Sequence, residues 1–258
     1  MNPTLLGLLA VFGMFLAMLL LLEAGRRLGE RHFARDPEAA KAGGAVEGAV
    51  FGLMALLIAF TFSGAAARFD VRRALVVEEA NDIGTAWLRL DLLPVAAQPP
   101  LREKFRQYVD ARLAFYGKLP AVESASADLV RSTALQAEIW REAVAGCRDA
   151  SSSTAPMLLL PALNQMIDIT TTRTMAAQTH APLLIYAMLG LLVLAGSLLA
   201  GYGMASGKTR DWFRVGAFAL IMALAIYVIL DFEFPRLGLI RVNAFDQVLV
   251  NLRQSMNP

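Results

Sequence analysis

Four long apolar runs constrain the fold of this chain more than any other feature of its sequence. They cover residues 5–22, 49–67, 182–204 and 215–230. An α-helix rises 1.5 Å per residue, so about 20 apolar residues cross the roughly 30 Å of hydrocarbon in a bilayer. The chain is 57% hydrophobic, and its charged residues gather between the runs. This distribution predicts an all-α integral membrane protein with four transmembrane helices rather than one large soluble core.

The second apolar run is not followed by a helix-stopping residue until Pro94. A helix from Ala49 to Leu92 would be about 65 Å long, roughly twice the thickness of the hydrocarbon, so much of it must project into water. Further helices are expected over residues 101–119, over residues 123–148, and from about Pro156 or Pro161 toward the third run. We therefore expect a helical-bundle soluble domain between spans two and three.

The predicted organisation has four parts. Residues 1–68 form a transmembrane hairpin whose basic loop runs from Gly25 to Gly48, and residues 69–180 form the soluble helical domain, continuous with span two. Residues 181–232 form the second transmembrane hairpin. Residues 233–258 form a C-terminal tail with a short amphipathic helix over residues 245–252.

The positive charges near the spans bear on the orientation in the membrane. The two short loops hold eight Lys or Arg residues: Arg26, Arg27, Arg31, Arg35, Lys41, Lys208, Arg210 and Arg214. Cytoplasmic loops carry an excess of Lys and Arg, which predicts that both loops lie in the cytoplasm and that the helical domain lies outside. Five arginines on the other side weaken this prediction: Arg68, Arg72, Arg73, Arg236 and Arg241.

Several classes of function are not supported by the sequence. The chain has no phosphate-binding glycine loop, no dinucleotide fingerprint, no zinc-protease helix motif and no nucleophile elbow, so we do not expect an enzyme. Cys147 is the only cysteine, and His32 and His180 have no metal-ligand spacing, so neither a metal nor a cofactor is expected. A net charge of +2 does not favour nucleic acid as a partner. The adjacent acids Glu78 and Glu79 point to different faces of a helix and suit a solvated surface or salt bridges.

The centres of the four spans contain no charged residue. Buried charges there would indicate a proton relay or a coupled transporter, whereas a channel can narrow its pore with apolar groups alone. The simplest explanation of Phe51, Phe60 and Phe62 is contact with lipid and packing between helices. Gly190, Gly196 and Gly201 in the third run would allow helices to approach closely.

The segment from Ile58 to Arg73 resembles the pore-helix region of bestrophin channels. An aromatic residue is followed eight positions later by an arginine–aromatic pair, as Phe60 is followed by Arg68 and Phe69. Three further stretches resemble the bacterial bestrophin-like domain family: residues 79–94, residues 166–169 with Arg173, and residues 231–241. That second resemblance covers nearly the whole chain.

The resemblance implies a homo-oligomer, a pentamer, with span two around a central pore for inorganic ions. The pore-lining residues would be Gly52, Leu56, Phe60 and Ser63, with Arg68, Phe69 and Arg72 at the pore exit or helix junction. Gly52 departs from the apolar rings of bestrophins, and no acidic calcium clasp is found. The resemblance places the protein in a bacterial plasma (inner) membrane, with the helical domain in the cytoplasm, against the charge count.

Two hypotheses remain open at this point. The first is a bestrophin-like oligomeric ion channel with span two lining the pore. The alternative is a non-conducting membrane sensor or scaffold whose helical domain binds a ligand or a protein partner. Recording from the purified protein separates the two, because only the first predicts a conductance.

Overall fold

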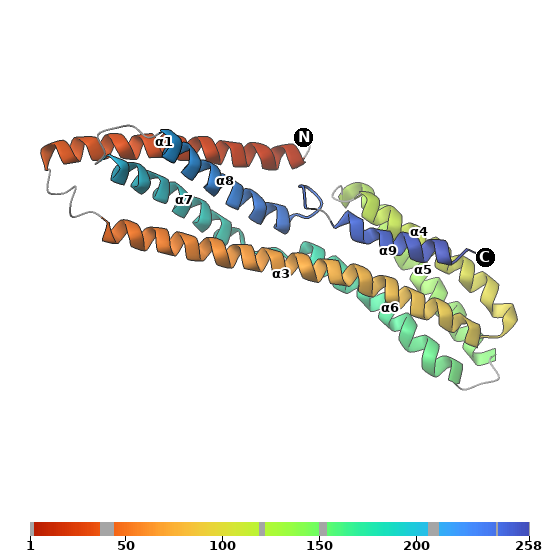
Figure 1. Cartoon of the computed structure of the whole chain (residues 1–258). Helices are drawn as coiled ribbons and strands as arrows, with labels where there is room; N and C mark the ends of the chain where they lie inside the picture. The colour runs from red at the N-terminus through yellow and green to blue at the C-terminus, as the bar shows by residue number, and fades with distance from the viewer. Residues whose placement is uncertain are drawn as a thin grey trace. The chain divides into compact units, whose positions relative to one another are not determined.

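A computed structural model describes residues 3–36, 44–118, 122–149, 154–205, 212–240 and 242–257. Among these residues every regular element is helical, which confirms the all-α prediction. The elements are α1 (Pro3–Arg35), α3 (Ala45–Arg89), two short 3₁₀ turns (Leu90–Leu92 and Val95–Ala97), α4 (Gln98–Lys118), α5 (Val122–Asp149), α6 (Thr154–Gln178), α7 (Leu183–Met204), α8 (Trp212–Glu233) and α9 (Asn243–Ser255). They form two compact units (Figure 1).

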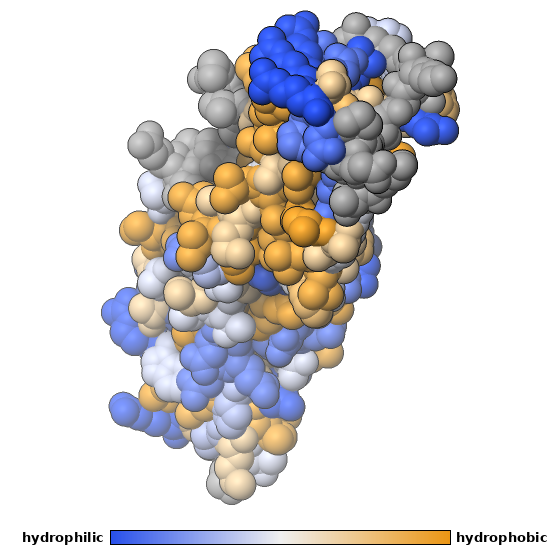
Figure 2. Space-filling model, turned by 90° about the vertical axis from the view of Figure 1, so that its left-hand side faces the viewer, coloured by the Kyte–Doolittle hydropathy of each residue, from blue (hydrophilic) through white to orange (hydrophobic). Residues whose placement is uncertain are grey.

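Unit 1 comprises residues 1–68 and 180–239, and contains α1, the first part of α3, α7 and α8. Its core is apolar and draws on all four helices, with Met18 from α1, Met54 from α3, Val193 from α7 and Ala223 from α8. Many large apolar side chains on the same helices remain exposed, and Figure 2 shows a broad hydrophobic area on one face. A water-soluble protein rarely leaves so much apolar surface uncovered, so this surface suits contact with lipid.

Four helical stretches are long and apolar enough to cross a membrane. They are Gly7–Arg35, Ala45–Leu92, Thr154–Met204 and Trp212–Glu233. Two of them are far longer than a crossing requires, with 48 and 51 residues, because the second contains all of α3 and the third contains α6 as well as α7. The four-span prediction is thus supported by length and composition.

Close packing of α1 against α7 depends on small residues. A Cβ added at Gly25 would overlap the backbone carbonyl of Leu198, and one added at Gly201 would overlap that of Leu22. Gly29 lies one turn after Gly25, and a Cβ there would come within 2.6 Å of the Tyr202 carbonyl oxygen. Small residues four apart allow two helix backbones to approach closely in a membrane. The sequence contains this signal on α1.

The first basic loop is shorter than predicted. α1 continues through Arg35, so Arg26, Arg27 and Arg31 belong to a helix and not to a loop. Arg26 forms an ion pair with Glu30 at 2.8 Å, and Arg27 one with Glu23 at 2.8 Å; such pairs one turn apart support a helix that is polar on its surface. In the second loop, Arg214 lies in α8. The predicted loop residues Lys41, Lys208 and Arg210 lie outside the described part of the chain.

Unit 2 comprises residues 69–179 and 240–258, and contains the second part of α3 with α4, α5, α6 and α9. Pro99 and Pro100 lie in the first turn of α4, where a missing backbone N–H breaks no helical hydrogen bond. α6 begins at Thr154, two residues before Pro156 and so near the first of the two predicted starts, and Pro161 lies inside it. The predicted tail is divided, since residues up to 239 belong to unit 1 and residues from 240 onward pack in unit 2.

Candidate pore helix and its anchoring contacts

The α3 helix exposes one line of residues in unit 1. Gly52, Leu56, Phe60 and Ser63 recur every three or four residues, and all four are exposed. The exposed fraction is 51% for Leu56 and 67% for Phe60, and nothing lies within 4 Å of a Cβ built on Gly52. The opposite side of the helix carries Met54, Thr61 and Ala65, which are buried. The four predicted pore-lining residues therefore share one face, and it is not the face that packs inside unit 1.

The three phenylalanines of span two have different surroundings. Phe51 lies edge-on to Phe218 of α8 with ring centroids 6.3 Å apart, and Phe62 lies edge-on to Phe232 at 5.5 Å. Those two rings hold α3 against α8. The exposed fraction of Phe60 is 67%, compared with 41% for Phe62.

The predicted junction residues lie on a different face of α3. Arg68 donates from Nη2 to Glu233 Oε2 at 2.6 Å, and from Nε to both carboxylate oxygens at 3.1–3.2 Å. The same carboxylate pairs with His180 Nδ1 at 3.0 Å and accepts from the Ala181 backbone N–H at 3.4 Å. The Glu233 side chain is fully buried, so these partners compensate its charge. Arg68 therefore links α3 to the end of α8.

Phe69 and Arg72 are buried in unit 2. Arg72 donates from Nε to the Ala176 carbonyl oxygen at 3.0 Å and from Nη2 to that of Thr179 at 2.8 Å. Carbonyl groups at a helix C-terminus have no partner within the helix, and a cation there is favourable. Arg72 therefore caps the end of α6.

A buried charge network connects the helices of unit 2. Glu79 of α3 accepts from Arg112 Nε at 2.6 Å and from Arg173 of α6, and the hydroxyl of Tyr116 donates to it at 2.9 Å. The side chains of Glu79 and Arg112 are fully buried. Arg173 also reaches Asp246 of α9 at 3.5 Å. One carboxylate thus ties together α3, α4 and α6, and α9 joins through Arg173.

Two tyrosines complete the polar interior of unit 2. Burial raises the pKa of the Tyr116 hydroxyl, and the neighbouring carboxylate of Glu79 raises it further, so it remains a neutral donor. Burial likewise raises the pKa of Tyr108, whose hydroxyl lies 3.2 Å from Thr170 Oγ1 and accepts from Gln136 Nε2 at 3.1 Å. Every helix around this core therefore contributes a polar group that another helix satisfies.

The sequence alone did not predict this network. Glu78 and Glu79 do point to different faces, as helical geometry requires. Of the two predicted alternatives, a solvated surface or salt bridges, the second is confirmed for Glu79, which pairs with Arg112 and Arg173 but is fully buried. Its position three residues after Val76 and four before Ile83 places it on the apolar stripe of α3, which is the signal that reveals its burial. No group of three or more His, Cys, Asp and Glu side chains among the described residues could hold a metal ion.

The helices and spans define an all-α integral membrane protein with a polar helical unit. The chain belongs to the family of the Bestrophin-like domain, whose model matches residues 11–244. Two crystal structures of a bacterial Bestrophin homolog from Klebsiella pneumoniae, each with one mutation, share the fold. One has a TM-score of 0.68 at 16% identity over 95% of this chain and 97% of that one. The other has a TM-score of 0.70 at 15% identity over 96% and 98%.

No curated protein matches the chain. The chain thus belongs to the Bestrophin-like family and shares its fold with a bacterial Bestrophin homolog.

Proposed function

We propose that copies of this chain assemble into a homo-oligomeric ion channel, a pentamer by resemblance, in which the exposed face of α3 lines the pore. The protein would be a multi-pass protein of the bacterial inner membrane. Membership of the Bestrophin-like family supports the general class. The line Gly52, Leu56, Phe60 and Ser63 supports the choice of helix, because it is exposed along several turns of a span without charged residues.

The proposal depends most on the surroundings of the Ser63 hydroxyl. Two other hydroxyls in the spans bond a carbonyl oxygen one turn earlier: Thr61 of α3 donates to that of Leu57 at 2.7 Å, and Ser197 of α7 donates to that of Val193 at 2.8 Å. Ser63 is exposed and makes no such bond among the described residues. A Ser63 hydroxyl that faced lipid tails without such a bond would be unsatisfied, whereas one facing water in a pore is hydrated. Ser63 therefore favours a pore over a lipid-facing surface.

Leu56 and Phe60 lie one helical turn apart on the same face, and repeated around a ring they would form two apolar constrictions. An apolar constriction closes a pore by excluding water. Replacing Leu56 or Phe60 by alanine should therefore raise the unitary conductance or the open probability in planar bilayers of the purified protein. Leu20→Ala is the matched control, because Leu20 is 72% exposed on α1 and lies outside the proposed pore.

Thiol modification tests the same face more directly. Ser63→Cys, in a chain whose Cys147 is replaced by serine, should react with a charged, water-soluble thiol reagent, and the reaction should reduce the current. Leu20→Cys in the same background should leave the current unchanged. A monomeric mass together with the absence of any conductance would reject the channel, and a stable hetero-complex would then favour the sensor or scaffold.

A further inference from the structure

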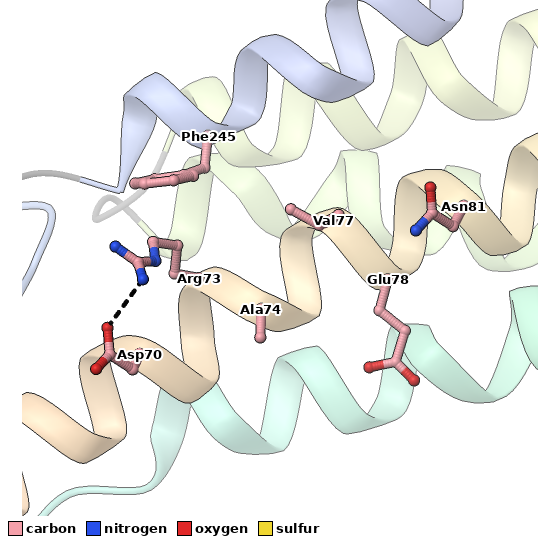
Figure 3. A pocket seen from close by; sticks show the side chains of 7 residues that line it. All are labelled: Asp70, Arg73, Ala74, Val77, Glu78, Asn81 and Phe245. Atoms are coloured by element: carbon pink, nitrogen blue, oxygen red, sulfur yellow. Dashed lines mark ion pairs between the residues drawn. The ribbon is translucent and has the colours of Figure 1, made fainter.

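The exposed face of α3 changes character in unit 2. Asp70, Ala74, Glu78 and Asn81 follow the same spacing of three or four residues, and all are exposed. They line an open pocket of about 460 Å³, together with Arg73, Val77 and Phe245 (Figure 3). The exposed face of α3 thus carries apolar and small side chains in unit 1, and mostly acidic and polar side chains in unit 2.

Among the arginines of α3 in unit 2, two bind elsewhere, and one, Arg73, pairs with an acid of this face. Arg72 caps α6, and Arg89 donates to the Leu158 carbonyl oxygen at 2.5 Å. Arg73 lies over the ring of Phe245, 5.1 Å from its centroid, and pairs with Asp70 at 3.3 Å. Figure 3 shows Asp70 and Arg73 directed toward each other, so their charges offset one another.

Glu78 differs from Asp70. It makes no ion pair with any described residue, and its carboxylate extends away from Arg73 and Phe245 in Figure 3. The exposed line of α3 in unit 2 therefore carries one carboxylate, that of Glu78, whose charge is not offset by an ion pair with any described residue.

We infer that Glu78 makes the pore selective for small inorganic cations over anions, an inference that rests on the proposed channel. Each copy in a ring contributes one Glu78 carboxylate. Rings of acidic side chains raise the local concentration of cations and repel anions. The carboxylate is exposed and has no coordinating neighbours, so it acts through its field on hydrated ions rather than by binding one.

The test is the reversal potential of the purified full-length protein in a planar bilayer with a KCl gradient. The reversal potential of the wild-type protein should lie toward the equilibrium potential of K⁺ rather than that of Cl⁻. Glu78→Gln should lower the cation-to-anion permeability ratio several-fold. Glu103→Gln is the control, since Glu103 is an exposed acid on α4, and it should leave the ratio unchanged. At about 1 M salt the screening length falls to about 3 Å, so the wild-type preference should decline toward that of Glu78→Gln.

The outcomes separate this inference from the channel itself. A conductance that prefers anions, or a cation preference that Glu78→Gln leaves intact, overturns the role of Glu78 and leaves the channel standing. The absence of conductance in the wild-type protein counts against the channel. A ratio that falls in Glu78→Gln but not in Glu103→Gln, at equal oligomer mass, supports the inference.

Discussion

The two units rely on buried charges to different extents. The core of unit 1 is built from apolar and small side chains, and its buried carboxylate Glu233 is held by Arg68 and His180. Unit 2 has a charge network at its centre, with Glu79 and Arg112 fully buried. A lipid-exposed unit gains little from the hydrophobic effect between its helices, so close backbone packing must hold them together. A water-exposed unit has an apolar core for stability, and we expect its buried charges to help specify which helices meet.

The two units are vulnerable to substitution at different kinds of position. In unit 1 the sensitive positions are those where two backbones touch, and an added methyl group has no space. In unit 2 the sensitive positions are those where one buried charge compensates two others, as Glu79 does for Arg112 and Arg173. Substitutions of similar size should therefore have different effects in the two units.

The largest effect is expected for Glu79→Gln. The variant leaves the buried guanidinium groups of Arg112 and Arg173 without their carboxylate, and removing one partner of a buried pair costs about 3–5 kcal/mol. The midpoint of thermal or denaturant unfolding in detergent, followed by circular dichroism, should fall sharply.

Glu78→Gln is the matched control for that experiment, because the neighbouring glutamate is exposed and should change the free energy of unfolding by no more than about 0.5 kcal/mol. Equal midpoints for the two variants would show that the network does not stabilise unit 2.

A double variant that replaces both Glu79 by glutamine and Arg112 by methionine should lose less stability than the sum of the losses in the two single variants, since the two residues are in contact.

A smaller effect is expected for Gly25→Ala in unit 1. The added Cβ would meet the Leu198 carbonyl, which is backbone and cannot rotate away. Overpacking of this kind costs about 1–3 kcal/mol. Gly13→Ala, on the same helix with nothing within 4 Å of the added Cβ, should be neutral or slightly stabilising. Loss of stability in both variants would point to a general effect on α1 rather than to its contact with α7.

The contrast between the units also explains how much could be predicted from the sequence. The apolar runs determine the four spans, and the proline at position 94 determines where the long helix ends, because both are local signals. The common face of Leu56 and Phe60 follows from helical spacing. Membership of the family agrees with the resemblance found around Arg68 and Phe69.

The contacts between helices could not be predicted in this way. Arg112 lies 33 residues from Glu79 and Arg173 lies 94 residues from it, so nothing local pairs them. Gly25 and Gly29 stand beside charged residues that are typical of a loop, and this concealed a close-packing signal within a helix. Charge and composition show how polar a segment is, but they do not show which side of it is buried.

The smallest effect is expected for Tyr116→Phe, which removes one hydroxyl from the network. Loss of a buried hydrogen bond costs about 1 kcal/mol, so the variant should remain folded at neutral pH.

The pH dependence of the stability of Tyr116→Phe is more informative. A tyrosine in an unfolded chain ionises near pH 10, and burial raises the pKa of Tyr116 above that value in the native state. The unfolded state therefore loses its proton first, and native stability falls as the pH rises past about 10. Tyr116→Phe should lose less stability between pH 8 and pH 11 than the wild type. An identical loss in both proteins would mean that Tyr116 does not remain protonated inside unit 2. Water would then have to reach the network around Glu79.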